Sequence, residues 1–465
     1  MLQTVIRVEW RNLRRETSAW ITVSVFAALV VWAALNGRTH TDVMTQSVQE
    51  AHSEQQQQMQ QWVSALAAGD ENAQDAYKAG KDHVHQVVAL PLSPLASISM
   101  GGLSDTVLRV SLASRLESTG EAHVGSPVRQ ATGPFDVTFV FVYLLPLVVI
   151  GLSYDLLSGE RERGTLALIL SQPVSLVTFT LGKAIQRALV LLGVVFTLAT
   201  VAPWLAGGDL SEPGAPARLG LYLLLVAAYT TFWFAAAVAV NAWGSTSAGN
   251  ALALMACWLV LIVILPGFVS VGVDVVVPQP SRIELLNLAR EAAAEAEQEA
   301  SQMEGDHAPD RETLKDRYRA TVKRSLEVQQ ELESTVKPVL EQFQAQLSEQ
   351  QALVDKLRFV SPAIILYEGL TDVAGVGVDR RSWYLSQVDR FHDQWRSFFS
   401  EKAANDQSVT AADIAALPRF HYAEEPTGKL TLRVMLGSLG LVFPTAVLLL
   451  LAWRGLRRPD AVSLR

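Results

Sequence analysis

The sequence predicts an all-α polytopic membrane protein with six transmembrane helices, both termini in the cytoplasm, and a large helical extracytoplasmic domain built from two inserts. Hydrophobic residues make up 50% of the 465 residues and gather in long runs. These runs are about twenty residues long, the length that an α-helix needs to cross roughly 30 Å of hydrocarbon. The net charge of −8 gives no general case for nucleic-acid binding. The single cysteine, Cys257, excludes a disulfide within one chain and a zinc site built on several cysteines.

The chain begins with a basic segment at residues 1–18, which predicts an interfacial helix on the cytoplasmic surface of the membrane. Its arginines are Arg7, Arg11, Arg14 and Arg15. The first span is predicted at residues 19–36. A cleaved signal peptide is the alternative, because the start is basic and the middle is apolar. A retained span is favoured, because the apolar part is long and no clear small-x-small cleavage site follows it.

Two long polar inserts separate the remaining apolar runs. Residues 37–133 follow the first span and residues 273–430 follow the fifth. The other five spans are predicted at residues 134–154, 178–202, 218–241, 250–272 and 431–453. Lysine and arginine residues flank the spans on one face, which the positive-inside bias assigns to the cytoplasm together with the tail at residues 454–465. Both inserts then lie outside the cell membrane.

The second insert changes character along its length. Residues 281–303 are rich in alanine and glutamate, and residues 311–357 carry apolar residues at steps of three to four, which together predict a long helical hairpin. Residues 359–430 are rich in aromatic side chains and predict shorter helices. The aromatic residues between Trp383 and Phe399 recur near helical spacing, so core packing is favoured over a ligand platform.

The stretch at residues 155–177, between the second and third spans, is the densest charge cluster of the membrane-spanning half. Residues 158–166 mix both signs of charge and are flanked by leucines. One interpretation is a solvated loop that follows the positive-inside bias. The other is a docking helix whose apolar side lies on the bundle and whose charged side contacts a partner protein. The residues alone leave both open.

A longer pattern in this stretch supports the docking interpretation. It consists of Glu160, Arg161, Glu162, Gly164, Thr165 and Leu166, then Ser171, Pro173 and Val174, then Gly182 and Lys183. In order and spacing this resembles the coupling-helix region of ABC-2-type transporter permeases. The resemblance implies that two copies of a separate cytoplasmic ABC ATPase subunit dock beneath two permease subunits, and that the charged residues 160–163, including Arg163, contact the ATPase. Gly164 would permit a sharp turn and Pro173 would end the helix.

The two large inserts depart from the short outer loops of a minimal permease. They resemble the branch of the family that carries a DUF3526-type region. Three stretches carry this resemblance: residues 172–174 (Gln-Pro-Val), residues 361–363 (Ser-Pro-Ala) and residues 418–420 (Pro-Arg-Phe). The family implies a multi-pass protein of the bacterial inner membrane, in contact with lipid, whose second permease subunit is an identical copy or a related paralogue.

No enzymatic or cofactor site is predicted. Gly182 and Lys183 are the nearest approach to a phosphate-binding loop, but Val177 stands where its first glycine is required and Ala184 where it needs serine or threonine. ATP hydrolysis is therefore expected on the separate subunit. His83 and His85 are two residues apart, and on the expected helix they would not share a face, so a metal site is disfavoured.

The acidic residues near the spans are also expected to have a structural and not a proton-transfer role. Asp136 and Asp155 flank the second span, and no acidic residue lies deep in any span, so both are expected to be interfacial anchors and not a proton relay.

The sequence therefore predicts a permease subunit that couples ATP hydrolysis on its partner to substrate translocation or export. The alternative is an ATP-driven mechanotransmitter, in which the outer domain acts on a periplasmic or outer-membrane protein and nothing is transported. A substrate cavity would distinguish the first, and a sealed membrane core the second. A sensor is disfavoured, because it would need a cytoplasmic signalling domain that the sequence does not contain.

Overall fold

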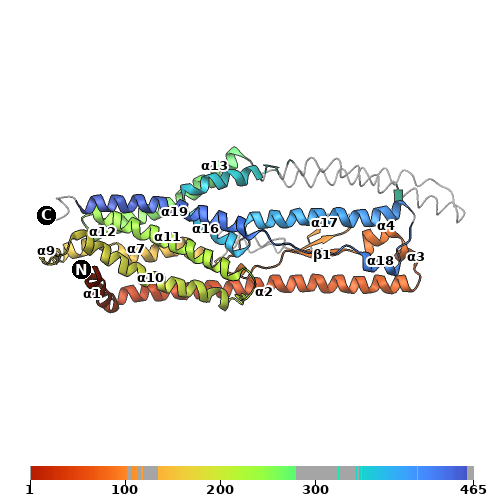
Figure 1. Ribbon diagram of the computed structural model, residues 1–465, viewed down its shortest axis with the longest axis horizontal. Helices are drawn as coiled ribbons and strands as arrows, with labels where there is room; N and C mark the ends of the chain where they lie inside the picture. The colour runs from red at the N-terminus through yellow and green to blue at the C-terminus, as the bar shows by residue number, and fades with distance from the viewer. Residues whose placement is uncertain are drawn as a thin grey trace.

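The computed structural model describes residues 2–101, 107–112, 117–118, 135–278, 348–405 and 407–457, with residues 322–323, 342 and 345–346. The described chain forms an elongated molecule that begins and ends at the same extremity (Figure 1). Six helices within these residues are long and apolar enough to cross a membrane. The predicted all-α class with six membrane helices is therefore confirmed.

The six candidate spans form one bundle, with a short helix, α1 (Leu2–Arg15), at its foot. In chain order they comprise α2 (Thr17–Ala67); α6 (Val137–Phe139), η3 (Val140–Leu144) and α7 (Leu145–Ser153); α10 (Leu176–Leu205); α11 (Ala215–Trp243); α12 (Ser247–Trp258), η4 (Leu259–Ile264) and α13 (Leu265–Val276); and α19 (Thr427–Leu456). Helix α11 lies at the centre, where Tyr222, Tyr229 and Trp233 are fully buried. It packs against α7, α10, α16 and α19.

Two of the spans contain a π-helical segment just before a proline. Pro146 follows η3 and Pro266 follows η4, each at the second residue of the next helix. Proline lacks the amide that would donate to the preceding turn, and a π-helical turn lets the surrounding backbone groups find other partners. Both spans thus remain continuous despite the proline.

Helix α2 does not end where the first insert was predicted to begin. It runs for 51 residues from the foot of the bundle far into the distal domain, by which we mean residues 42–94, 107–118 and 378–422 as far as they are described. At 1.5 Å per residue its length is about 77 Å. The polar stretch after Gly37 contains no proline and is rich in glutamine, so nothing in it interrupts the helix. Gly37 itself lies directly against the backbone of Ser97.

The distal domain has one core to which both inserts contribute. Trp62, Val88 and Leu108 from the first insert pack with Tyr384 and Trp395 from the second. The predicted core packing of the aromatic residues is thus confirmed at Tyr384, Phe391, Trp395 and Phe399. The elements of the first insert are α3 (Glu71–Gln74), α4 (Ala76–Lys78) and η1 (Ala79–His83), and those of the second are α17 (Val378–Ala404) and α18 (Ala411–Ala416).

A small antiparallel sheet that the sequence analysis did not predict completes this domain. Its order is β1 (Gln86–Ala89), β2 (Val107–Val110) and β3 (Glu117–Ser118), and Gln86 pairs with Val110. The runs Gln-Val-Val-Ala and Val-Leu-Arg-Val are rich in valine, a residue that favours strands. His83 ends η1 and His85 lies in the extended segment before β1, so the pair does not share one helix.

The bundle and the distal domain meet at a junction formed by three short elements. These are η2 (Ala96–Ile98), η5 (Arg358–Val360) and α16 (Pro362–Ala374). Helix α16 packs against α11 and α19. The predicted hairpin arm at residues 281–303 and most of the arm at residues 311–357 lie outside the described residues.

Candidate functional site

The stretch predicted to dock a partner lies at the end of the bundle that carries α1, which we call the terminal end (Figure 1). It folds as two short helices, α8 (Ser158–Glu162) and α9 (Leu166–Leu170), where the sequence analysis expected one. Gly164 separates them with a φ of 72°, a left-handed conformation that glycine adopts at little cost. Pro173 lies between α9 and α10. The chain therefore doubles back at the terminal end before it enters the next span.

Glu160 fastens α8 to the foot of α10. Its Oε1 accepts a hydrogen bond from Lys183 Nζ at 3.0 Å, and the hydroxyl of Thr165 donates to its Oε2. The side chain of Lys183 is 6% exposed and that of Glu160 is 16% exposed. Thr165 and Lys183, which follow Glu160 by 5 and 23 positions in the sequence, thus both bind its carboxylate. All three residues were singled out from the sequence, and they form a partly buried ion pair that also receives a hydrogen bond.

Arg161 and Glu162 fasten α8 to the turn between α11 and α12. Arg161 Nη1 donates to the carbonyl of Gly244 at 2.8 Å. The carboxylate of Glu162 accepts from the backbone amide of Ser247 at 2.6 Å and from the hydroxyl of Ser247 at 2.8 Å. The first amides of a helix have no partner within the helix and carry partial positive charge. Glu162 therefore stabilises the start of α12 from outside it.

Two buried asparagines complete this connection, and the sequence analysis did not assign them a role. Asn241 donates to the carbonyl of Ser153 at 2.9 Å, and its Oδ1 accepts from the amide of Leu157 at 3.2 Å. Asn250 donates to the hydroxyl of Ser158 at 3.1 Å and to Asn241 Oδ1 at 3.2 Å. The sequence pattern that could have indicated them is their position, because both asparagines border a short polar turn between two apolar runs. At such a turn, backbone groups lose their partners within the helix, and a buried side-chain amide can form hydrogen bonds with them.

The foot of α10 also holds α1. Arg187 ion-pairs with Asp155 at 3.2 Å and with Glu16 at 3.6 Å, and it donates to the carbonyl of Leu152. Asp155, predicted to be an interfacial anchor, is thus part of an ion pair between two spans. Glu9 on α1 is 7% exposed. Burial raises its pKa, while Lys183 and Arg187 nearby act in the opposite direction.

The surface that α8 and α9 leave open is smaller than the predicted contact set. Glu162, Arg163, Gly164 and Pro173 are exposed, and Leu168 in the middle of α9 is 69% exposed. Other predicted residues face inward. Glu160, Arg161 and Thr165 are half-buried, and Leu166 packs in a cluster with Leu156, Leu157 and Ala452.

The described residues offer no constellation for a metal: no group of three or more His, Cys, Asp or Glu side chains is close enough to hold one. The terminal-end cluster instead consists of ion pairs and helix caps that join α1, α8, α10 and α12. Such a cluster holds these elements in fixed relation to one another.

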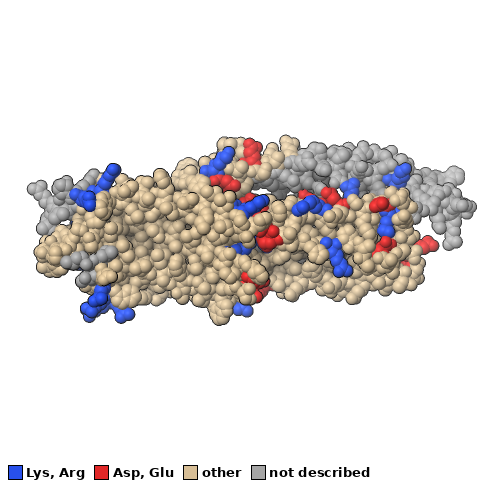
Figure 2. Space-filling view, in the orientation of Figure 1, with Lys and Arg blue, Asp and Glu red and all other residues tan. Residues whose placement is uncertain are grey.

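Charge marks both limits of the bundle. On the face shown in Figure 2, lysine and arginine gather at the terminal end, and charge of both signs reappears only at the junction and beyond it. Six apolar helices bounded in this way define a multi-pass membrane protein. Residues 3–420 match the family model described as ABC-2 family transporter protein, and the chain belongs to this family. It is therefore a membrane permease of the ABC transporter class, which pairs with an ABC ATPase. No curated protein sequence matches the chain significantly.

Proposed function

We propose that this chain couples ATP hydrolysis on a separate ABC ATPase subunit to substrate translocation, and that movement of the ATPase enters through α8 and α9. One observation carries the proposal: α8 is bonded to three neighbouring elements at once. Glu160 holds α10, Arg161 holds the end of α11, and Glu162 holds the start of α12. A force applied to α8 would therefore act on three spans together.

The charge distribution supports a cytoplasmic location for the terminal end. Exposed arginines gather there, whereas acidic residues accompany the basic ones at the junction. Cytoplasmic segments next to spans carry an excess of lysine and arginine. The exposed arginines of the terminal end are Arg7, Arg11, Arg14, Arg15, Arg163, Arg454 and Arg457. The distal domain would then face the periplasm of a bacterial inner membrane and would represent the DUF3526-type region.

The exposure of the spans supports a second permease subunit. In the most apolar stretch of 18 residues within the span Ser247–Val276, only 11% of the residues are buried, whereas 67% are buried in the corresponding stretch of Val137–Glu162. Leu252, Phe268 and Val275 on the first of these are each at least 70% exposed. This face would contact a second copy or a paralogue, with lipid on the remainder, whereas the second span lies inside the bundle of its own chain.

Cysteine cross-linking tests the coupling proposal directly. In a Cys257→Ser background, Leu168→Cys places a thiol on α9, and Leu432→Cys, also well exposed, places one at the junction end of α19. The thiol is labelled with benzophenone maleimide in membranes of the source cell, ultraviolet light inserts the benzophenone into C–H bonds of neighbouring proteins, and the adducts are identified by mass spectrometry. We expect an ABC ATPase cross-linked to Leu168→Cys and not to Leu432→Cys. The proposal fails if neither variant, or only Leu432→Cys, captures an ATPase.

A second function, mechanotransmission without transport, is favoured by the continuity of α2. A single helix links the terminal end to the far part of the distal domain, so a tilt in the membrane would move the distal domain as well. The variant Val43→Pro breaks this helix at a 48% exposed position beyond the predicted span. A transporter should retain substrate translocation in this variant, whereas a mechanotransmitter should lose its action on its periplasmic or outer-membrane partner and keep ATPase binding.

A further inference from the structure

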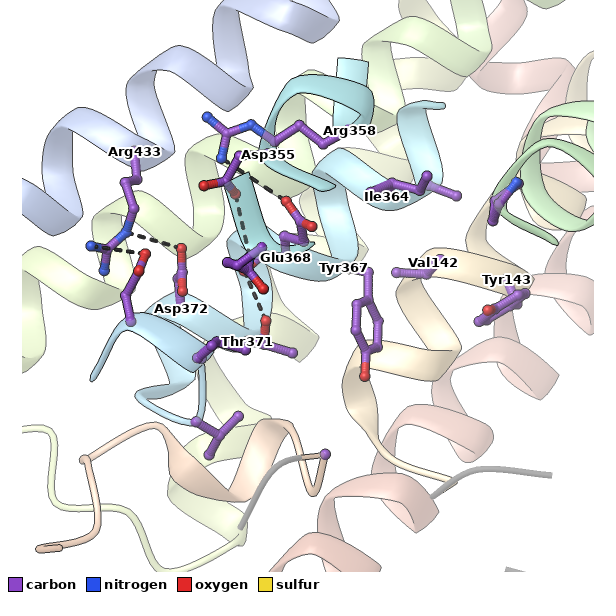
Figure 3. A pocket seen from close by; sticks show the side chains of 18 residues that line it. Val142, Tyr143, Asp355, Arg358, Ile364, Tyr367, Glu368, Thr371, Asp372 and Arg433 are labelled. Carbon is purple, nitrogen blue, oxygen red and sulfur yellow. Dashed lines mark hydrogen bonds and ion pairs between the residues drawn. The ribbon is translucent and has the colours of Figure 1, made fainter. Parts of the chain in front are cut away.

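A cavity of about 350 Å³ lies at the junction, between α16, α17, α19 and the distal ends of two spans. Figure 3 shows its lining side chains, with charged residues such as Glu368 and Arg433 gathered on one side and Val142, Tyr143 and Ile364 on the other. One wall is apolar and is formed by Val142, Tyr143, Pro266 and Ile364. Cavities that hold small ligands start at about 300 Å³ and combine an apolar lining with a few polar groups. The dimensions and composition of this cavity meet both conditions.

The opposite wall carries more acidic than basic groups. Of the charged residues in the described lining, Asp355, Glu368, Asp372 and Asp379 are acidic and Arg358 and Arg433 are basic. This imbalance gives the wall a formal excess of two negative charges when all six groups are ionised.

Arg433 is fully engaged by the carboxylates beside it. It lies 3.2 Å from Asp372, 3.2 Å from Asp379 and 2.9 Å from Glu425. A guanidinium bonded to three carboxylates cannot neutralise a fourth.

Glu368 is the carboxylate for which too little positive charge remains. Among the described residues its ion pair is with Arg358 Nη1, at 4.0 Å, the outer limit of such contacts. Its side chain is 20% exposed. Burial raises the pKa of Glu368 to about 8, and the nearby Asp355, Asp372 and Asp379 act in the same direction against Arg358. A partly buried carboxylate with this environment is stabilised by an added cation.

We propose that the junction cavity binds an amphipathic organic cation, with its apolar body against Val142, Tyr143 and Ile364 and its positive group beside Glu368. An inorganic cation would leave the apolar wall uncovered, and an anion would meet the excess of carboxylates. Tyr143 and Tyr367 place aromatic rings in the lining, which also favours a cationic group. The site belongs to this chain alone and does not depend on the proposed ATPase coupling.

The probe for this proposal is tetraphenylphosphonium, an apolar cation, with tetraphenylborate as an anion of the same shape. Binding of the labelled cation is measured by equilibrium dialysis with the full chain in nanodiscs, and empty nanodiscs correct for partitioning into lipid. We expect saturable binding of the cation, and no saturable binding when labelled tetraphenylborate is dialysed in its place. Glu368→Gln should weaken it about tenfold or more, since the loss of one charge contact at about 1.4 kcal/mol is a factor of ten.

Two further variants separate charge from shape. Asp393→Asn removes one carboxylate from an exposed position on α17 outside the cavity, so its affinity should equal that of the wild type. Ile364→Trp fills the apolar side and should abolish binding whatever the charge. Each variant must elute as the wild type does in size-exclusion chromatography. Equal affinity in a folded Glu368→Gln variant, or preferential binding of tetraphenylborate, would overturn the proposal.

The pH dependence of binding gives an independent readout. A bound cation favours the ionised form of Glu368, so affinity should rise as pH increases towards 8 and then level off. Asp372, whose pKa burial raises to about 6, contributes at the lower end of this range. Glu368→Gln should remove the upper part of the rise, and a rise that persists unchanged would contradict the proposal. The charged groups around Glu368 are Asp355, Arg358, Asp372, Asp379, Glu425 and Arg433.

Discussion

The two ends of the membrane bundle differ in how well their partly buried acidic side chains are paired with positive charge. At the terminal end the partly buried acid Glu160 has both a cationic partner at 3.0 Å and a hydroxyl donor. At the junction the partly buried acid Glu368 has one distant partner and a pKa of about 8. A satisfied charge cluster fixes elements relative to one another, whereas an unsatisfied one gains free energy from a ligand. This difference underlies the two proposals made above, force transmission at the terminal end and ligand binding at the junction.

The largest effect on stability is expected when the cationic partner of Glu160 at the terminal end is removed. Lys183→Met leaves Glu160 partly buried without its cation, and we expect the free energy of unfolding to fall by about 3–5 kcal/mol. Unfolding in detergent followed by tryptophan fluorescence measures it. The double variant Lys183→Met with Glu160→Gln should recover much of the loss. Arg38→Met, at an exposed pair with Asp42, should cost about 1 kcal/mol at most. Equal losses at both pairs would remove the basis of the comparison.

The matching change at the junction should have the opposite sign. A raised pKa means that the folded state holds the proton more tightly than the unfolded state, so the stability that this proton provides is complete below about pH 4.5 and is lost as pH rises through 8. Glutamine does not ionise, so the Glu368→Gln variant does not lose stability in this way as the pH rises. We expect the variant to match the wild type at pH 5 and to exceed it by about 2 kcal/mol at pH 9, less than the full 1.4 kcal/mol per pKa unit because Glu368 is partly exposed.

Melting curves of wild type, Glu368→Gln and Glu160→Gln at both pH values make the comparison direct. Glu160→Gln leaves Lys183 without its counter-ion and should destabilise the protein at pH 9, where Glu368→Gln stabilises it. If both changes destabilise the protein at pH 9, then Glu368 is satisfied within the chain and the contrast fails.

A smaller effect is expected at the turn between α8 and α9. Gly164→Ala introduces a side chain at a φ of 72° with open space around it, so only the backbone is strained, at about 1–2 kcal/mol. Gly193→Ala, inside α10 and also in open space, should instead stabilise by up to about 1 kcal/mol. Thermal melting of the two variants gives the sign of each change. A neutral Gly164→Ala variant would mean that the turn adapts without strain.

The smallest effect on stability and a clear effect on assembly are expected at Arg163. Because this side chain is exposed, Arg163→Glu should change the free energy of unfolding by no more than about 0.5 kcal/mol. As a contact residue it should lower the affinity for the ATPase about tenfold, which corresponds to about 1.4 kcal/mol. Co-purification at graded ATPase concentrations measures this. Unchanged binding would restrict the docking surface to α9.

The number of spans was predictable from the sequence, because it depends on local pattern, and the predicted docking stretch was located in the same way. Apolar runs of membrane length and the Glu160 to Leu166 motif each lie within one continuous segment. The continuation of α2 was missed, since its polar part is solvated and lacks the apolar periodicity that indicates a packed helix. The β-sheet was missed because its strands have at most four residues.

The chemistry of the candidate sites was harder to predict than their location. Glu160 and Lys183 were both singled out, but nothing local indicates that they pair with one another and not with a partner protein. The junction cavity has no motif at all, because its charged wall combines α16 residues with Arg433 from α19 and Asp379 from α17. Only the folded chain brings these side chains together.

The shared core of the distal domain has a consequence for how the protein is made. Trp62 and Leu108 must remain without their partners Tyr384 and Trp395 until more than half of the remaining chain has been synthesised. At about 5–20 residues per second the interval between Trp62 and Tyr384 is roughly 15–60 s. Four of the candidate spans, including α11 at the centre of the bundle, emerge during this interval. Five of the six spans can thus enter the membrane before the distal domain closes, whereas α19, which packs against α11, follows only after Tyr384 and Trp395 have been made.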